Sequence, residues 1–250
     1  MFRKLMLATG AVLALSAGGA MGQPAAHAGH TTAATPDNIA KAVADAGRTP
    51  EDKARDAARK PAEMLAFAGV KPGDKVAELL PGGGYFTRVL SPAVGPTGKV
   101  YAAVQAAALE KATAEAKGNV TPLAYTGAAF KTPETVDLVF TAQNYHDLHL
   151  KRLNLDVAAA NKALFDSLKP GGTLLIIDHV AATGSPVEVA DTLHRIDPAI
   201  VKKEVEAAGF TFVGQSDAIR NPADDHTKAV FDPAIRGHTD QFVYKFKKPG

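Results

Sequence analysis

The 250-residue chain contains no cysteine and no tryptophan, and aromatic residues make up only 6% of it. Without cysteine it cannot form a disulfide framework, a zinc or iron–sulfur site with thiolate ligands, or a thiol nucleophile. With so few aromatic side chains, a base-stacking surface for single-stranded nucleic acid is not expected. Hydrophobic residues (46%) and charged residues (22%) are present in the proportions of a protein that can bury a core.

The N-terminus has the order of regions found in a bacterial secretory signal. Arg3 and Lys4 precede an uncharged apolar run at residues 5–17, and small residues follow. The run is shorter than the about 20 residues that a membrane span needs, and an uncleaved N-terminal anchor is the alternative. Cleavage after Gly22 or after Ala28 fits the small-residue rule. We therefore expect a signal peptide over 1–22, a flexible segment over 23–37, and a periplasmic or secreted protein.

A strong excess of either charge is also lacking. Signal cleavage removes Arg3 and Lys4 from the 28 basic residues, which leaves 26 basic and 26 acidic residues. A protein without net charge has no long-range attraction to DNA, RNA or acidic lipid. We expect a small-molecule partner, no nucleic acid, and no membrane contact after cleavage. The oligomeric state is left open.

The pattern of residues 49–69 predicts a helical extension that covers the rest of the domain. Thr49 is a capping residue, Pro50 suits the first helical position, and the helix is expected to run to about Arg59. Pro61 starts a second helix, which ends before Gly69.

From residue 71 onward, short apolar runs alternate with helical stretches. Seven strands are expected, at 75–80, 98–104, 120–125, 136–141, 172–178, 210–214 and 241–247. Helices are expected at 86–94, 106–117, 153–168 and 198–208. Strands that are apolar on both sides and alternate with helices predict a parallel sheet covered on both faces. Residues 38–250 are thus predicted to form one doubly wound α/β domain with a mostly parallel, seven-stranded sheet, in which 219–240 is a long loop between the last two strands.

A glycine-rich loop, Pro81-Gly82-Gly83-Gly84-Tyr85, follows the first strand. Ligands of open α/β sheets lie at the carboxyl ends of the strands, where glycine lets the backbone approach them closely. No Gly-Lys-Ser/Thr follows, so the loop is not a P-loop, and it lacks the spacing of a dinucleotide-binding motif. A tight turn without a ligand is the alternative. Glu78, inside the preceding strand, favours a binding loop.

Three stretches, VAELLPGGGYFT, VDLVFTAQNYHDLH and LKPGGTLLIIDHVA, together resemble the class I S-adenosylmethionine-dependent methyltransferases. More closely, they resemble a bacterial group of predicted methyltransferases that are often made with a signal peptide. The resemblance runs from about Arg48 to the C-terminus and includes HRIDPAIVKKEVEAAGF and RNPADDHTKAVFDPAIRGHTDQF. It implies a Rossmann-like class I fold, S-adenosylmethionine as cofactor, and methyl transfer to an unidentified, small-molecule acceptor.

By this likeness, Glu78, Gly82 and Gly84 belong to the loop that contacts the methionine end of the cofactor, together with Pro81, Gly83 and Tyr85. Two positions depart from the pattern of the class. Leu80 stands where the loop normally has its first glycine, and the second strand lacks the terminal acid that holds the ribose. Gln105 could make one neutral hydrogen bond there instead, at a loss of about 1–2 kcal/mol. An exported, non-catalytic module that binds another small ligand is therefore the alternative function, whereas a hydrolase is disfavoured by the missing G-x-S-x-G motif.

Gln143-Asn144-Tyr145-His146-Asp147 follows the fourth strand at the same edge. Gln143 and Asn144 are predicted to contact the cofactor. His146 could accept a proton from an O–H or N–H acceptor, with Asp147 or a nearby acid orienting it. Alternatively, Asp147 caps a helix and His146 only lines the cleft.

Histidines at two further places bear on the site. His146 and His149 have an H-x-x-H spacing, but a metal site needs a third ligand, and no metal is predicted. His194 and Arg195 precede the helix that Asp197 is expected to cap, and we predict that both line the acceptor pocket. The long loop at 219–240 is predicted to be a lid or substrate-binding loop, with a solvated loop as the alternative.

Overall fold

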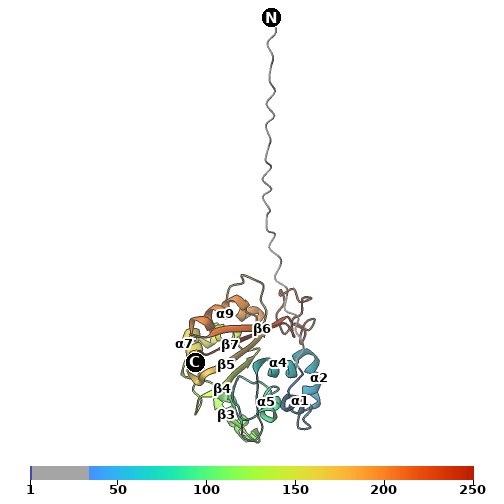
Figure 1. Ribbon diagram of the computed structural model, residues 1–250, viewed down its shortest axis with the longest axis vertical. Helices are drawn as coiled ribbons and strands as arrows, with labels where there is room; N and C mark the ends of the chain where they lie inside the picture. The colour runs from blue at the N-terminus through green and yellow to red at the C-terminus, as the bar shows by residue number, and fades with distance from the viewer. Residues whose placement is uncertain (2–33) are drawn as a thin grey trace. The chain divides into compact units, whose positions relative to one another are not determined.

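Seven strands form one sheet in the order β3-β2-β1-β4-β5-β7-β6 in the computed structural model (Figure 1). The strands are β1 Lys75–Leu79, β2 Lys99–Val104, β3 Val120–Ala124, β4 Val136–Ala142, β5 Leu168–His179, β6 Thr211–Ser216 and β7 Gln241–Lys247. Strands β1 to β5 pair in parallel, and β7 lies antiparallel between β5 and β6. The predicted mostly parallel, seven-stranded sheet is confirmed.

The structure describes Met1 and residues 34–250, of which 35–250 form one compact unit. The predicted signal peptide, apart from Met1, and most of the predicted flexible segment lie outside the described residues. Among the helices of the described part, none has the length and apolar character needed to cross a membrane.

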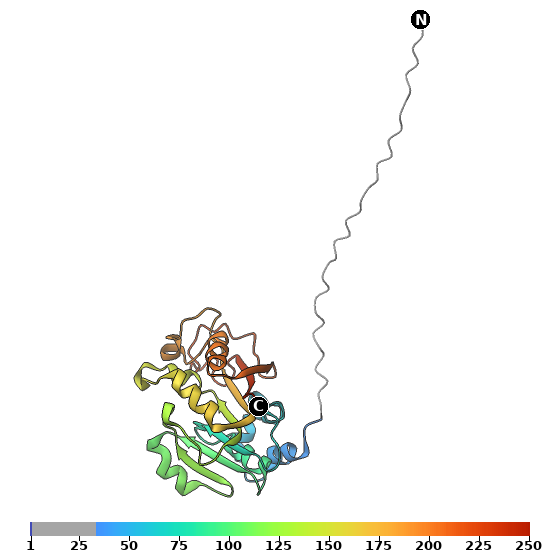
Figure 2. The ribbon, with the colours of Figure 1, turned by 60° about the vertical axis from the view of Figure 1, so that its left-hand side comes forward.

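Helices cover both faces of the sheet (Figure 1 and Figure 2). The α-helices are α1 Asp37–Ala44, α2 Pro50–Ala54, α3 Asp56–Arg59, α4 Pro61–Ala68, α5 Thr87–Val94, α6 Leu109–Glu115, α7 Val157–Ser167, α8 Val189–Leu193 and α9 Pro198–Ala207. Short 3₁₀ turns are η1 Ala106–Ala108, η2 Gly127–Ala129, η3 His146–His149 and η4 Lys151–Leu153. Helices α1, α4 and α5 pack on one face, and α7 and α9 pack on the other.

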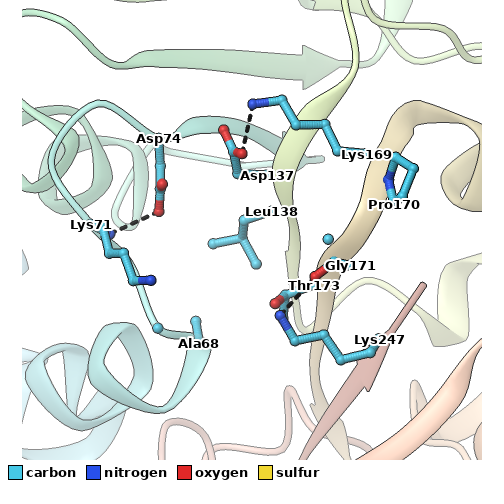
Figure 3. Close-up of a pocket in the computed structure, with 12 residues that line it drawn as sticks. Ala68, Lys71, Asp74, Asp137, Leu138, Lys169, Pro170, Gly171, Thr173 and Lys247 are labelled. Carbon is cyan, nitrogen blue, oxygen red and sulfur yellow. Dashed lines mark hydrogen bonds and ion pairs between the residues drawn. The ribbon is translucent and has the colours of Figure 1, made fainter. Parts of the chain in front are cut away.

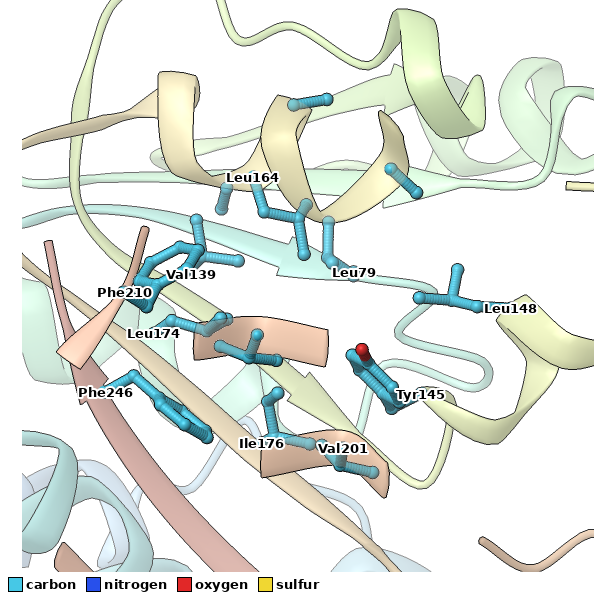
Figure 4. Packing of buried hydrophobic residues seen from close by; sticks show 14 of the residues in the cluster. Leu79, Val139, Tyr145, Leu148, Leu164, Leu174, Ile176, Val201, Phe210 and Phe246 are labelled. Atoms are coloured by element: carbon cyan, nitrogen blue, oxygen red, sulfur yellow. The ribbon is translucent and has the colours of Figure 1, made fainter. Parts of the chain in front are cut away.

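Neighbouring residues of the central strands β1, β2, β4 and β5, and of β7, enter different cores. In β4, Val139 packs in the cluster that includes Leu164 of α7 and Val201 of α9 (Figure 4). The next residue, Phe140, packs in the opposite cluster with Val89 of α5. Because both faces are buried, the strands read as continuous apolar runs, which is why the sequence located them.

Element boundaries differ from the prediction at several places, among them the start of α7, which is at Val157 instead of the expected residue 153. Strand β5 begins at Leu168, directly after α7, rather than at the expected residue 172. Leu168 pairs with Val136 and Thr173 with Leu138, so residues 169–172 form a bulge of β5 between these two pairs. The expected helix at 49–59 is divided at Arg55 into α2 and α3. The expected helix at 106–117 is the turn η1 followed by α6. The two predicted caps are confirmed, because Thr49 accepts from the Asp52 N–H at 3.1 Å and Asp197 from the Ala199 N–H at 2.9 Å.

Residues 217–240, all described, connect β6 to β7 without a helix or strand. Arg195 holds this loop: its side chain is 0% exposed, and it donates to Asp224 at 3.0 Å and to the carbonyls of Lys228 and Val180, each at 2.9 Å. Asp224 also accepts from the backbone N–H of Asp240 at 2.7 Å. The prediction that Arg195 lines the acceptor pocket is therefore wrong, because the hydrogen bonds of its buried guanidinium are with Asp224 and with two backbone carbonyls of the domain.

Replacing Arg195 by methionine should lower the free energy of unfolding by about 3–5 kcal/mol, since Asp224 is left buried without its ionic partner. Urea denaturation followed by circular dichroism measures this. The matched control is Arg236→Ala, an exposed arginine of the same loop, which should stay within about 0.5 kcal/mol of the parent. A loss below about 1 kcal/mol in Arg195→Met would contradict the anchoring role.

Candidate functional site

The glycine loop lies where the sheet order reverses. Strand β1 has β2 on one side and β4 on the other, which makes the carboxyl ends of β1 and β4 the ligand-binding crevice expected of such a sheet. Leu80, Gly82 and Gly84 have φ values of +48°, +56° and +76°. Leu80 thus adopts a left-handed backbone that is strained by about 1–2 kcal/mol in a residue with a Cβ.

Two hydrogen bonds hold Leu80 in this conformation. Its N–H donates to the Ala103 carbonyl at 2.7 Å, and its carbonyl accepts from the Asn144 side chain at 3.0 Å. The Asn144 amide also donates to the Ala142 carbonyl at 2.8 Å. Asn144, predicted to contact the cofactor, therefore ties the end of β4 to the glycine loop through its side chain.

Glu78 lies beneath the loop and is buried. Its carboxylate accepts a hydrogen bond from the Thr87 hydroxyl, at the first turn of α5, at 2.5 Å. Burial raises the pKa of Glu78 to about 7, although the Thr87 hydrogen bond and the charges of Arg59 and Arg88 oppose the rise. The group can therefore gain or lose a proton near neutral pH, directly under the loop.

Ion pairs fasten the N-terminal helices to the loop. Arg88 of α5 donates to Asp52 of α2 at 2.5 and 2.9 Å. The Tyr85 hydroxyl donates to Asp56 at 2.6 Å, and Asp56 also accepts from Arg48. The Tyr85 side chain is buried in this interface, so the expectation that it contacts the cofactor is corrected: only its backbone belongs to the loop.

Arg59 is a site residue that the sequence analysis missed. Its guanidinium lies 4.8 Å from the centroid of the Tyr85 ring and 5.7 Å from that of Phe86, and it donates to the Gln143 side chain. Burial lowers the pKa of Arg59 to about 10, which still leaves it charged at neutral pH. Nothing in the local sequence distinguishes it from the other basic residues of the N-terminal helices; only the fold brings it to the crevice.

Gln143 follows β4 and Gln105 follows β2, so the two residues lie on opposite sides of β1 at this edge. Gln143 has a φ of +65°, accepts from Arg59, and donates to Gln241 at 2.9 Å. A cavity of only about 10 Å³ remains among Arg59, Phe86 and Gln143. Gln105 is exposed after β2, and its contact with a ribose stays a prediction.

Asp178, at the end of β5, fixes His146. Its carboxylate accepts from the His146 backbone N–H at 2.7 Å and pairs with His146 Nδ1 at 2.8 Å. Burial lowers the pKa of His146, but the charge and hydrogen bond of Asp178 outweigh this effect and raise it. Since Nδ1 is engaged, Nε2 is the nitrogen of His146 that is left for other chemistry, and it lies 3.5 Å from Asp147 Oδ1.

His194 completes a cluster with these residues. It leaves α8 with a φ of +52°, and its ring packs edge-on against His146 and Phe231, with centroids 5.4 and 4.8 Å away. One ligand atom from each of His146, Asp147 and His194 lies within 4.8 Å of the other two. Of the four residues predicted for proton transfer or for the acceptor pocket, the structure thus brings together His146, Asp147 and His194, but not Arg195. His149 is engaged elsewhere, because its Nε2 lies 3.1 Å from Glu204.

A larger cavity of about 190 Å³ opens at the opposite edge of the sheet (Figure 3). Lys71, Asp74 and Lys169 line it, and Lys169 pairs with Asp137 at 2.7 Å. These residues lie at the amino ends of β1, β4 and β5. The cavity is therefore separate from the glycine loop and from the histidine cluster.

Comparison with known proteins supports the architecture. No family model matches the chain, and no curated protein has a similar sequence. Among solved structures, an S-adenosylmethionine-dependent methyltransferase of Aquifex aeolicus has a TM-score of 0.56 and 23% identity, over 78% of this chain and 93% of that one. The N-methyltransferase NodS of Bradyrhizobium japonicum has a TM-score of 0.55 and 17% identity, over 80% and 98%. An arsenic(III) S-adenosylmethionine methyltransferase of Chlamydomonas reinhardtii has a TM-score of 0.54 and 18% identity, over 86% and 74%. The predicted Rossmann-like methyltransferase fold is confirmed.

Substitution of Glu78 by glutamine should make the free energy of unfolding less dependent on pH. The folded state holds the Glu78 proton more tightly than the unfolded state, so the stability that this proton confers is full below pH 4.5 and is lost as the pH rises to about 7. Relative to the parent, Glu78→Gln should gain on the order of 3 kcal/mol between about pH 4.5 and pH 8. Urea denaturation across that range measures the gain. The exposed Glu110→Gln is the control, and a constant difference between Glu78→Gln and the parent would show that burial does not perturb Glu78.

Proposed function

We propose that the protein is an S-adenosylmethionine-dependent methyltransferase that acts on a small-molecule acceptor. The observation that carries the proposal is the loop at 80–84, which lies at the point of strand reversal with the buried Glu78 beneath it. The similar solved structures are methyltransferases by name, which supports the same chemistry on this fold. The signal-like N-terminus supports the further proposal that the protein is exported and belongs to the bacterial group that its sequence resembles.

In this proposal the methionine end of the cofactor lies along the glycine loop. Gly83 has open space where a Cβ would be, so the backbone at this position can be approached closely. Arg59 is the partly buried cation beside the loop, and it suits the α-carboxylate of the cofactor. Because Arg59 and Gln143 fill the crevice, their side chains must rotate to admit the cofactor, with the carboxylate replacing Gln143 as the partner of Arg59.

The cluster of His146, Asp147 and His194 is the proposed acceptor subsite. It follows β4 and β5 at the same edge of the sheet as the glycine loop. In methyl transfer the nucleophile attacks the methyl carbon in line with the departing sulfur. Most of the rate can come from holding the two reactants in this orientation, so the site needs no nucleophilic side chain of its own.

Isothermal titration calorimetry with S-adenosylhomocysteine tests the cofactor site. Arg59→Ala should weaken binding about 10-fold to 100-fold, because a buried carboxylate loses its charge-assisted partner. Arg55→Ala is the matched control: Arg55 is exposed and lies over the same Tyr85 ring, 5.1 Å from its centroid, and its removal should leave the affinity unchanged. Absence of binding to the parent protein at millimolar ligand would refute the proposed function.

A further inference from the structure

We infer that His146, Asp147 and His194 bind one divalent transition-metal ion of the Zn²⁺ type. Two imidazole nitrogens and a carboxylate oxygen are a ligand set that such ions prefer, and three protein ligands leave coordination positions for a substrate. The three ligand atoms already lie within 4.8 Å of one another without an ion. Zn–N and Zn–O bonds of about 2.0–2.2 Å need only small side-chain rotations from this arrangement.

The ring of His146 is already oriented for coordination. Asp178, which is 0% exposed, holds Nδ1 at 2.8 Å and the backbone N–H of the same residue at 2.7 Å. A carboxylate that accepts from one nitrogen of a histidine while the other nitrogen binds the ion is a recurrent outer-shell arrangement of metal sites. It fixes the tautomer that presents Nε2 toward Asp147 and His194.

The third ligand comes from a distant segment in a constrained conformation. His194 caps the C-terminal end of α8 in the left-handed region, and its ring is held between those of His146 and Phe231. A left-handed backbone at a residue with a Cβ is unfavourable and persists where its surroundings demand it. The surroundings here place an imidazole beside His146, which the spacing of His146 and His149 alone did not reveal.

The charges of the site match those of a divalent ion. Asp147 coordinates directly and Asp178 lies behind His146, so two carboxylates oppose two positive charges. A metal ion of this type is a Lewis acid, so an oxygen of an anionic ligand can take one of its open coordination positions. If the proposed methyl transfer is correct, on which this last step rests, the acceptor is an oxygen acid that binds the ion.

Titration with Zn²⁺ by calorimetry, and with Co²⁺ by visible absorption, tests the site in the absence of cofactor. One ion should bind per chain, and cobalt should show the d–d bands of nitrogen and oxygen coordination. The chain has no cysteine, so thiolates cannot produce the signal. Asp147→Asn and His194→Asn should each weaken metal binding at least about tenfold. Loss of an outer-shell group already costs about that much, and these two residues are direct ligands. Asparagine at 194 tolerates the positive φ, and thermal unfolding verifies that each variant is folded.

His238→Ala is the matched control, because His238 is exposed and is not one of the three grouped ligands, so its loss should not change the affinity. Absence of binding at 100 µM ion, or equal affinity in the parent and both cluster variants, would overturn the inference. His149→Ala distinguishes the pair His146 and His194 from the pair His146 and His149. An unchanged metal affinity supports the cluster, and a loss equal to that of His194→Asn contradicts it. Failure of metal binding leaves cofactor binding to S-adenosylhomocysteine intact, so the two proposals fail separately.

Discussion

The hydrogen bonds of Asp178 are the interaction on which the candidate site depends. This carboxylate is fully buried at the end of β5, where an unpaired charge would be costly, and it is satisfied by the N–H groups of His146 and His179 and by the His146 ring. The bonds join the segment after β4 to the end of β5. As a result, His146 is held at the edge of the sheet with only one ring nitrogen left for a ligand.

A second set of charges joins the N-terminal helices to the segment that follows the glycine loop. The pairs Arg88–Asp52 and Arg48–Asp56 draw the N-terminal helices over the glycine loop, and Arg59 enters the crevice with them. Each pair joins a buried side chain, Arg48 or Asp52, to a partly exposed one, so breaking a pair leaves a buried charge without its partner. The same helices then supply the cation that a carboxylate ligand requires.

The strands were predictable because burial on both faces requires a continuous run of apolar residues, as in β4. The caps at Thr49 and Asp197 were predictable because a side-chain oxygen at the start of a helix accepts from a backbone N–H two or three residues later. The ends of elements were less predictable: β5 begins at Leu168 because Leu168 pairs with Val136 of β4, and regular pairing resumes only at Thr173, so Lys169 to Gly172 are inserted between two paired positions. The roles of Arg195, Tyr85 and Arg59 could not be predicted. Their partners Asp224, Asp56 and Gln143 lie 29, 29 and 84 residues away, and only the folded chain brings them together.

A crystal structure of the protein with S-adenosylhomocysteine is the most direct test of the central claim. The account predicts that the homocysteine part lies along the loop at 80–84, with its carboxylate on Arg59 and its sulfur facing the cluster of His146, Asp147 and His194. A ligand bound in the cavity of about 190 Å³ at the opposite edge, or one whose sulfur faces away from His146, would contradict the account.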